Sequence, residues 1–336
     1  MGLFTTPSVL NQGFYIMMVL GLQGSPREKG NTAFLLSVFM DEAKKLGAQT
    51  DIVEVCKKNI IPCREYGVCE KKGFCPVDDD MKNEIYFLLR KADVIVAATP
   101  IFFYGPTAQL KALIDRCQMF WSRKNLLKLN DPYQNFRRGF LLSVGATKGA
   151  NLFNGVNLTA KYFLDAVGAV LDGSLTYRQI SATGDMQKHP TVLKDVKKAV
   201  GSLLNPFLAR KKIVFACREN ACRSQIASAF TRLFAGNKIE AVSGGSNPAV
   251  KVNATMVEVM KEKGIDMAFY RPQSIDEALS GGKPDMIITM GCAEECPLMP
   301  GIDIQEWNIP DPSGRSIGFM RNVRDIIEKN IIDLVG

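Results

Sequence analysis

The sequence contains a single histidine, His189, and this scarcity limits the chemistry that the chain can perform. His189 precedes Pro190 in a polar stretch typical of a surface loop, so catalysis by a histidine triad is not expected. Long apolar runs are also lacking, because nowhere do about 18 apolar residues follow one another, and we expect no membrane contact. The first residues lack the basic region and the cleavage site of a secretory signal, which predicts a cytoplasmic protein.

Stretches of Lys and Arg interleaved with aromatic residues are missing too, so the sequence predicts no nucleic-acid partner. The net charge is nevertheless +8, and the excess lies in residues 1–210. A basic half of this kind favours anionic small molecules or acidic surfaces. We find no internal repeat and no low-complexity tract. At about 150 residues per domain, a chain of 336 residues predicts two domains.

Apolar, strand-like segments alternate with helical segments in two successive series. Such alternation predicts parallel, doubly wound sheets, and hence an α/β fold of two domains. Residues 17–208 and 211–336 are the expected domains, after an N-terminal extension at 1–16, with Asn205-Pro206 and the basic triplet Arg210–Lys212 marking the boundary. The expected strands are 15–22, 50–56, 92–98, 139–144 and, with its approach, 166–175, then 212–216, 239–243 and 286–290. The expected helices are 31–46, 80–91 and 195–208, then 223–233, 254–263 and 319–334.

Three loops of the first unit are expected at the same sheet edge. The loop 24–32 (GSPREKGNT) has small residues, hydroxyls and a helix start, which suit a phosphate; a simple turn and helix cap is the alternative. The loop 99–107 (TPIFFYGPT) exposes aromatic residues that a planar cofactor or a dimer partner would cover. The loop 145–149 follows the next strand, and ligands bind at this edge of open parallel sheets.

These loops resemble those of the flavodoxin-like NAD(P)H-dependent FMN reductases, in the motifs GSPR-x-x-GNT and TP-x-x-x-YGP…LK-x-x-IDR. The resemblance implies bound FMN, NADH or NADPH as co-substrate, and a homodimer through this unit. The residues that it assigns to FMN are Ser25, Arg27, Asn31 and Thr32 for the phosphate, Pro100, Ile101, Phe102, Phe103, Tyr104 and Gly105 for the ring, and Gly145, Ala146 and Thr147 for further contacts.

Nine cysteines in a chain with no secretory signal indicate redox, metal or nucleophile chemistry. Cys63, Cys69 and Cys75 resemble the C-x2-C-x2-C-x5-C motif of iron–sulfur flavoproteins, but Tyr66 stands at the second position. A [4Fe–4S] cluster normally takes four thiolates, so we expect no bound metal and free thiols here. Cys56 is an alternative fourth ligand if a cluster binds.

The second unit begins with an apolar strand that ends in C-x5-R-S, at a strand-to-helix turn. Backbone N–H groups of such a loop can surround a tetrahedral oxyanion, while Arg223 clamps two of its oxygens. The same groups stabilise a thiolate at Cys217, and Asn220 and Ser224 can add hydrogen bonds. Asp311, between two prolines, is a candidate general acid.

This unit resembles the low-molecular-weight tyrosine phosphatase fold, and within it the thioredoxin-coupled arsenate reductases. Gln225 and two further cysteines, Cys292 and Cys296, favour the reductase. Cys217 would attack arsenate or a similar oxyanion, Cys292 would attack Cys217, and Cys296 would attack Cys292. Cys222 remains an alternative partner for Cys217, and the order of attack stays open.

The expected protein is therefore an arsenate reductase fused to an NAD(P)H-dependent FMN reductase that supplies its electrons directly, or acts independently beside thioredoxin. Two alternatives stay open. The first is a protein tyrosine phosphatase fused to a flavodoxin-like reductase. The second is a sensor of redox state or of oxyanions.

Overall fold

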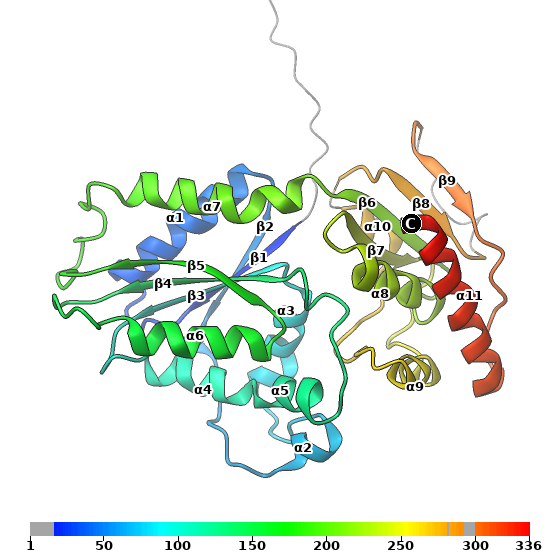
Figure 1. Ribbon diagram of the computed structural model, residues 1–336, viewed down its shortest axis with the longest axis horizontal. Helices are drawn as coiled ribbons and strands as arrows, with labels where there is room; N and C mark the ends of the chain where they lie inside the picture. The colour runs from blue at the N-terminus through cyan, green and yellow to red at the C-terminus, as the bar shows by residue number, and fades with distance from the viewer. Residues whose placement is uncertain (1–16, 281, 292–299) are drawn as a thin grey trace, which may run out of the picture.

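The computed structural model describes residues 17–280, 282–291 and 300–336. They form two parallel β-sheets, each flanked by helices, which lie next to each other along the long axis of the molecule (Figure 1). The chain passes from the first unit to the second between α7 and β6. None of the described helices has the length and apolar character needed to cross a membrane.

The first sheet has the strand order β2-β1-β3-β4-β5, and every neighbouring pair is parallel. Helices α1 and α7 cover one face, and α3, α4, α5 and α6 cover the other. The elements are β1 (Met18–Gln23), α1 (Asn31–Lys45), β2 (Gln49–Glu54), η1 (Val55–Lys57), α2 (Val68–Lys72), η2 (Met81–Ile85), α3 (Tyr86–Lys91), β3 (Val94–Pro100), α4 (Ala108–Arg116), α5 (Gln118–Asn125), β4 (Arg138–Val144), α6 (Asn154–Ala166), β5 (Val170–Tyr177) and α7 (Val192–Leu208).

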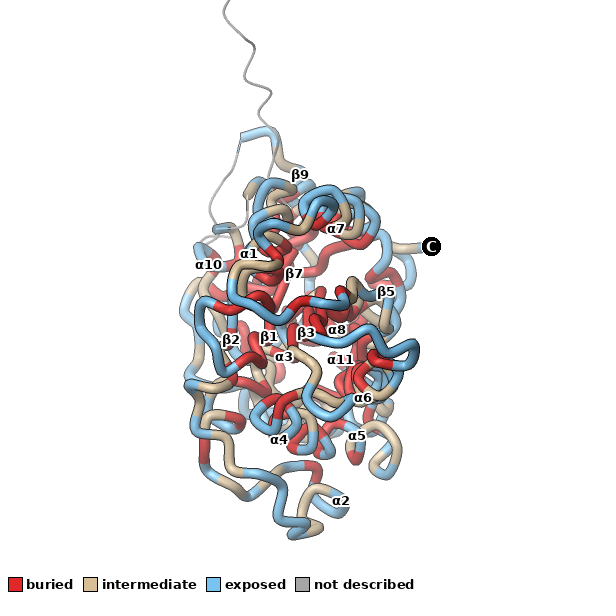
Figure 2. Tube along the Cα trace, turned by 90° about the vertical axis from the view of Figure 1, so that its left-hand side faces the viewer, coloured by how far each residue is buried: buried red, intermediate tan, exposed pale blue. Residues whose placement is uncertain are grey.

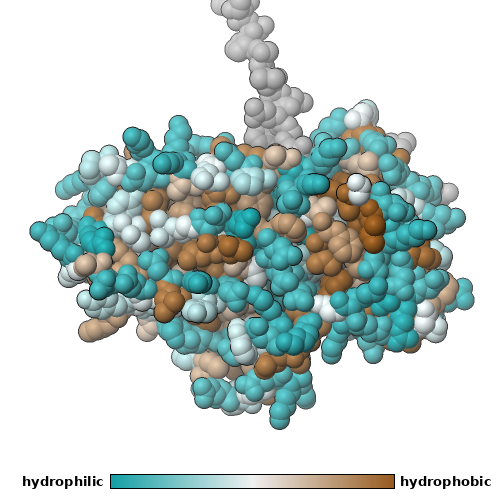
Figure 3. Space-filling view, in the orientation of Figure 1, coloured by the Kyte–Doolittle hydropathy of each residue, from teal (hydrophilic) through white to brown (hydrophobic). Residues whose placement is uncertain are grey.

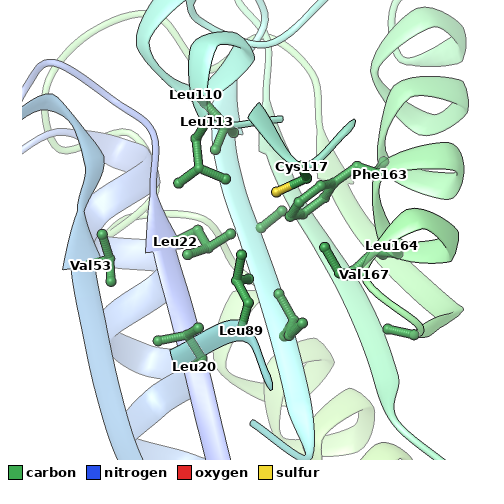
Figure 4. Close-up of a cluster of buried hydrophobic side chains, with 14 of the residues drawn as sticks. Leu20, Leu22, Val53, Leu89, Leu110, Leu113, Cys117, Phe163, Leu164 and Val167 are labelled. Carbon is green, nitrogen blue, oxygen red and sulfur yellow. The ribbon is translucent and has the colours of Figure 1, made fainter. Parts of the chain in front are cut away.

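Successive side chains of the central strands point to opposite faces and build two separate cores. In β1, Leu20 and Leu22 pack below α4 and α6, while Val19 packs against α1. Figure 4 shows the first of these cores, in which the Cys117 thiol lies among aliphatic and aromatic side chains. Figure 2 shows the buried central strands enclosed by helices with exposed outer faces. The nearly continuous apolar runs in the sequence follow from burial on both faces.

The second sheet has the order β7-β6-β8-β9 and is also parallel. Helices α8, α9 and α11 pack on one face, and the short α10 packs on the other. The elements are β6 (Lys211–Cys217), α8 (Arg223–Ala235), β7 (Ile239–Gly245), α9 (Ala254–Glu262), α10 (Ile275–Leu279), β8 (Met286–Thr289), β9 (Asp303–Glu306) and α11 (Ile317–Val335).

Buried ion pairs and aromatic contacts join the two units. Asp266 of the second unit has a fully buried side chain and accepts hydrogen bonds from Arg90 and Arg123 of the first, both at 2.7 Å. Phe269 packs against Tyr86, with ring centroids 5.6 Å apart. Removing one partner from a buried ion pair costs roughly 3–5 kcal/mol, so these contacts hold the units in a defined orientation.

The structure adds detail to two parts of the expected chain path. The segment 166–175 was expected to hold the fifth strand with its approach. It begins with the last residue of α6, and Gly168, with a positive φ of 75°, turns the chain into β5. In the basic triplet expected at the boundary, Arg210 and Lys212 are buried, whereas Lys211 is exposed. Apolar residues reach the surface in separate groups on the face drawn in Figure 3.

Candidate active sites at two sheet edges

Cys217 is the last residue of β6 and lies buried at the carboxyl edge of the second sheet. Its Sγ is 3.0 Å from Ser224 Oγ, at the start of α8. Ser224 Oγ also accepts a hydrogen bond of 2.8 Å from Asn220 Nδ2. The structure therefore brings the three residues expected from the motif into one hydrogen-bonded chain.

The backbone of the 217–224 loop turns its carbonyl groups outward. The carbonyls of Cys217, Arg218, Glu219 and Ala221 accept hydrogen bonds from the N–H groups of residues 246, 247, 249 and 253. Within the described residues, the N–H groups of 218–224 have no acceptor. Unpaired N–H groups at a helix start form an anion-binding site, and this array lies in the loop that begins at Cys217.

Asn220 has a positive φ of 49°, and two glutamines hold it in this conformation. Gln225 Nε2 donates to both Asn220 O and Asn220 Oδ1 at 3.1 Å, and the backbone N–H of Gln273 donates to Asn220 Oδ1 at 2.9 Å. A left-handed conformation is costly for most side chains, and these bonds offset that cost. Sequence reasoning singled out Gln225 by its position after the motif but missed Gln273, because no local pattern marks it.

Arg223 and Asp311 come together at the mouth of the loop. Arg223 Nη2 is 3.6 Å from Asp311 Oδ2, and Arg223 Nη1 donates to Ile309 O at 3.2 Å. The Asp311 side chain is 63% exposed, so its carboxyl group is accessible to a ligand in the loop. The roles of Arg223 as the clamp on an oxyanion and of Asp311 as the general acid remain predictions, which this geometry permits.

Of the other cysteines expected to react with Cys217 or with each other, the structure describes only Cys222. Cys222 is partly buried, with its Sγ 3.3 Å from Met320 Sδ. Burial raises the pKa of Cys222 to about 12, which disfavours its thiolate as an attacking group. Cys292 and Cys296 lie outside the described residues; they follow β8, whose carboxyl end lies beside that of β6.

A second cavity, of about 210 Å³, lies at the carboxyl edge of the first sheet, and we call it the flavin-side cavity. It is bounded by the turn before α1, the loops after β3 and β4, and the segment after β5. The expected residues that line it are Ser25, Arg27, Asn31, Thr32, Pro100, Ile101, Phe102 and Ala146. Phe103, Tyr104, Gly105, Gly145 and Thr147 are not among its lining residues, whereas Ile180 and Ser181, which sequence reasoning missed, are.

The residues at this cavity fit the phosphate end of FMN. Helix α1 has no side-chain cap, and the N–H groups of 31–33 have no acceptor within the described residues. Ile101 and Phe102 provide an apolar wall beside these donors. Asn31 also has a structural task, since its Nδ2 donates to Ala182 O at 2.8 Å and its Oδ1 accepts from Met186 N at 3.1 Å.

The aromatic loop forms a tight hairpin at this edge. Phe102 pairs with Gly105, and the two residues between them, Phe103 and Tyr104, have positive φ values of 47° and 64°. Aromatic residues seldom occupy such positions, so the turn stores strain. Phe103 is fully exposed, which is consistent with a surface that another molecule covers.

The segment between η1 and η2 carries three cysteines, with a tyrosine at the position expected for a fourth. Cys63 is exposed, and Cys69 and Cys75 are partly buried against the core of the first unit. Tyr66, at the position of the missing cysteine, is also exposed. Within the described residues, no three His, Cys, Asp or Glu side chains come together as metal ligands.

Comparison with known proteins agrees with this division of the chain. Residues 17–164 match the family model of NADPH-dependent FMN reductase, and residues 212–336 match that of low molecular weight phosphotyrosine protein phosphatase. An iron–sulfur flavoprotein of Methanocaldococcus jannaschii is 30% identical over 44% of this chain and 72% of its own. A putative arsenate reductase of Halobacterium salinarum is 35% identical over 37% of this chain and 89% of its own. The chain belongs to the family of the iron–sulfur flavoproteins in its first half and to that of the arsenate reductases in its second half.

Other relatives differ in how much of their length this chain matches. The iron–sulfur flavoprotein of Methanosarcina thermophila is 37% identical over 39% of this chain, and the match spans 65% of that relative. Among solved structures, a thioredoxin-dependent arsenate reductase of Corynebacterium glutamicum is 26% identical over 44% of this chain and 74% of its own, with a TM-score of 0.33. An arsenate reductase of Archaeoglobus fulgidus is 30% identical over 37% and 98%, with a TM-score of 0.32.

Proposed function

We propose that the second unit reduces arsenate through Cys217 and that the first unit is an NAD(P)H-dependent FMN reductase. The observation that carries this proposal is the array of unpaired N–H groups at 218–224, in the loop between the Cys217 thiol and Ser224, whose Oγ lies 3.0 Å from that thiol. An array of this kind suits a tetrahedral oxyanion and a thiolate together. The relatives named arsenate reductases favour arsenate over a phosphate ester as the substrate.

In the proposed reaction, the Cys217 thiolate forms a bond to arsenic, and one As–O bond breaks. Asp311 gives its proton to the departing oxygen, which leaves as water. A second thiolate, which we assign to Cys292, then attacks the Cys217 sulfur, and the As–S electron pair stays on arsenic as arsenite leaves. Two thiols become one disulfide while arsenic gains two electrons, and Cys296 carries that disulfide onward by exchange with Cys292.

The flavin-side cavity supports FMN as the cofactor of the first unit, and FMN accepts a hydride from NAD(P)H when bound. The N–H groups of 31–33 and the hydroxyl of Ser25 would hold the phosphate, and Ile101 and Phe102 would shield one side of the ring. The exposed Phe103 supports a homodimer through this unit. Thioredoxin remains a second source of electrons for the disulfide.

The test is NAD(P)H oxidation by the purified, FMN-loaded chain on addition of arsenate, with arsenite quantified and with thioredoxin either present or absent. We expect wild type to form arsenite in an amount that matches the thiols it oxidises. We expect Cys217→Ser to form none. Met320→Leu, which changes the neighbour of Cys222, is a control that keeps the reaction.

The outcome that would contradict arsenate reduction is aryl phosphate hydrolysis that survives Cys292→Ser and Cys296→Ser, with no arsenite formed. That result would assign the second unit to phosphatase chemistry, which uses Cys217, Arg223 and Asp311 but needs no second thiol.

A further inference from the structure

A cavity of about 500 Å³ lies between the two units, and we call it the interdomain cavity. It shares no lining residue with the flavin-side cavity, and none of residues 217–224 lines it. The first unit contributes the amino ends of β1 and β2, the end of α3 and the residue before β3; the second contributes β6, β7, α8 and the segment 269–273. Its volume lies within the range of small-molecule sites, roughly 300–1,000 Å³.

Cations without carboxylate partners line this cavity. Arg90 and Arg210, by contrast, are paired, the former with Asp131 and Asp266 and the latter with Asp93. Lys212, Arg232 and Arg271 form no ion pair with any residue that the structure describes. Glu240 lines the same cavity and faces Lys212 and Arg232, but the three cations outnumber this one carboxyl group, and their excess positive charge attracts an anion.

The three unpaired cations differ in how they are held. Lys212 is only 1% exposed, and its Nζ donates to Gly282 O at 3.2 Å. Arg232 Nε donates to Ala241 O at 3.0 Å. The Arg271 guanidinium lies over the Phe87 ring, 4.3 Å from its centroid. The Arg232 side chain also forms a hydrogen bond with Tyr270 and lies 5.7 Å from the centroid of the Tyr133 ring. Lys212 and Arg232 nevertheless carry more N–H groups than these contacts use, which leaves donors for a ligand.

Glu240 adds a second requirement to the same cavity. The residue is 8% exposed, and its Oε2 has no hydrogen-bond partner within the described residues. A buried carboxyl oxygen without a partner costs free energy, and a hydroxyl donor from a ligand would remove that cost. The cavity therefore offers cations for an anion and an acceptor for a hydroxyl group.

We propose that the interdomain cavity binds a small phosphate ester that carries free hydroxyl groups, a sugar phosphate or a nucleoside monophosphate. The phosphate lies beside Lys212, Arg232 and Arg271, and a hydroxyl group donates to Glu240. Gln225 also lines the cavity, and the same side chain holds Asn220 of the catalytic loop. Occupancy of the cavity therefore bears on the conformation of the loop around Cys217.

The experiment is calorimetric titration of the FMN-loaded full chain with ribose 5-phosphate and with AMP, and with ribose and adenosine as phosphate-free controls. Lys212→Met is expected to weaken binding of both phosphate esters by about tenfold or more, because a charge-assisted contact is lost. The matched control is Lys211→Met, since Lys211 is the exposed neighbour and does not line the cavity. Arg271→Ala, at an exposed residue, tests the same charge without disturbing a buried strand.

The unpaired N–H groups of the Cys217 loop also suit a phosphate group, and Arg223→Ala separates the two sites. We expect this variant to keep the affinity for ribose 5-phosphate, and Glu240→Ala to lower it more than the affinity for inorganic phosphate. Binding that Arg223→Ala abolishes and that Lys212→Met and Arg271→Ala leave intact would overturn the proposal, as would the lack of binding by the wild-type chain.

Discussion

Glu240 is the residue whose ionisation most directly couples stability to pH near neutrality. Burial, together with the nearby Asp93, raises its pKa from 4.5 to about 7, although Arg210, Lys212 and Arg232 oppose this rise. Between pH 4.5 and 7 the folded chain keeps a proton that the unfolded chain has released. Stability from this group is therefore full below pH 4.5, declines across that window and stays constant above it.

The change Glu240→Gln removes this titration. The free energy of unfolding of wild type should fall by about 3 kcal/mol relative to that of the variant between pH 4.5 and pH 8, because a shift of one pKa unit corresponds to about 1.4 kcal/mol. Denaturant unfolding at both pH values measures the difference. Glu306→Gln, on the exposed end of β9, is the control, and parallel pH dependences for wild type and Glu240→Gln would contradict the assignment.

At the scale of elements, the closeness of β7 to the catalytic loop leaves no space for a side chain at Gly245. A Cβ there would lie 2.7 Å from Arg218 O and 2.8 Å from Asn220 N, both backbone atoms. Gly245→Ala should therefore displace the loop and lower arsenate reduction about 100-fold, as a misplacement of ~1 Å can do. FMN content should not change, because the first unit is untouched.

The matched control is Gly201→Ala in α7, where a Cβ would meet nothing within 4 Å. It should stabilise the helix by about 0.5–1 kcal/mol and leave arsenite formation unchanged. Equal activity of Gly245→Ala and Gly201→Ala would show that the loop tolerates the displacement. Arsenite assays of both variants measure the effect on the reaction, and thermal unfolding measures the effect on stability.

The helices and strands also show which parts of the fold could be predicted from the sequence. Helices α1 and α8 begin at Asn31 and Arg223, as expected, since an apolar strand and a turn precede each. Strand β9 (Asp303–Glu306) was missed because its side chains are mostly exposed at a sheet edge and show no apolar alternation. Gln273 and the interdomain cavity were missed because they depend on contacts between distant segments, which no local pattern encodes.

At the scale of the whole molecule, the two candidate active sites face away from each other. The amino ends of β1 and β6 meet at the interdomain cavity, where Met18 and Lys212 are both lining residues. The flavin-side cavity lies at the carboxyl end of β3, and Cys217 at the carboxyl end of β6. Strands of seven residues span about 20 Å each, and Figure 1 shows the second unit at the opposite end of the first sheet from the segment between β5 and α7.

In the proposed reaction, electrons from NAD(P)H therefore leave the first unit at one end, while the thiols of the same chain need them at the other. Direct transfer within one chain does not fit this separation. We therefore expect the flavin unit of one chain to reduce the thiols of another chain, or a small dithiol to carry the electrons.

A mixture of two variants tests this expectation: Cys217→Ser, which keeps the flavin unit, and Ser25→Asp, which places a negative charge in the phosphate site. The mixture should form arsenite at a rate near that of wild type at equal concentrations of each working unit. Wild-type activity with an inactive mixture would instead require transfer inside a single chain, and hence a different arrangement of the two units during turnover.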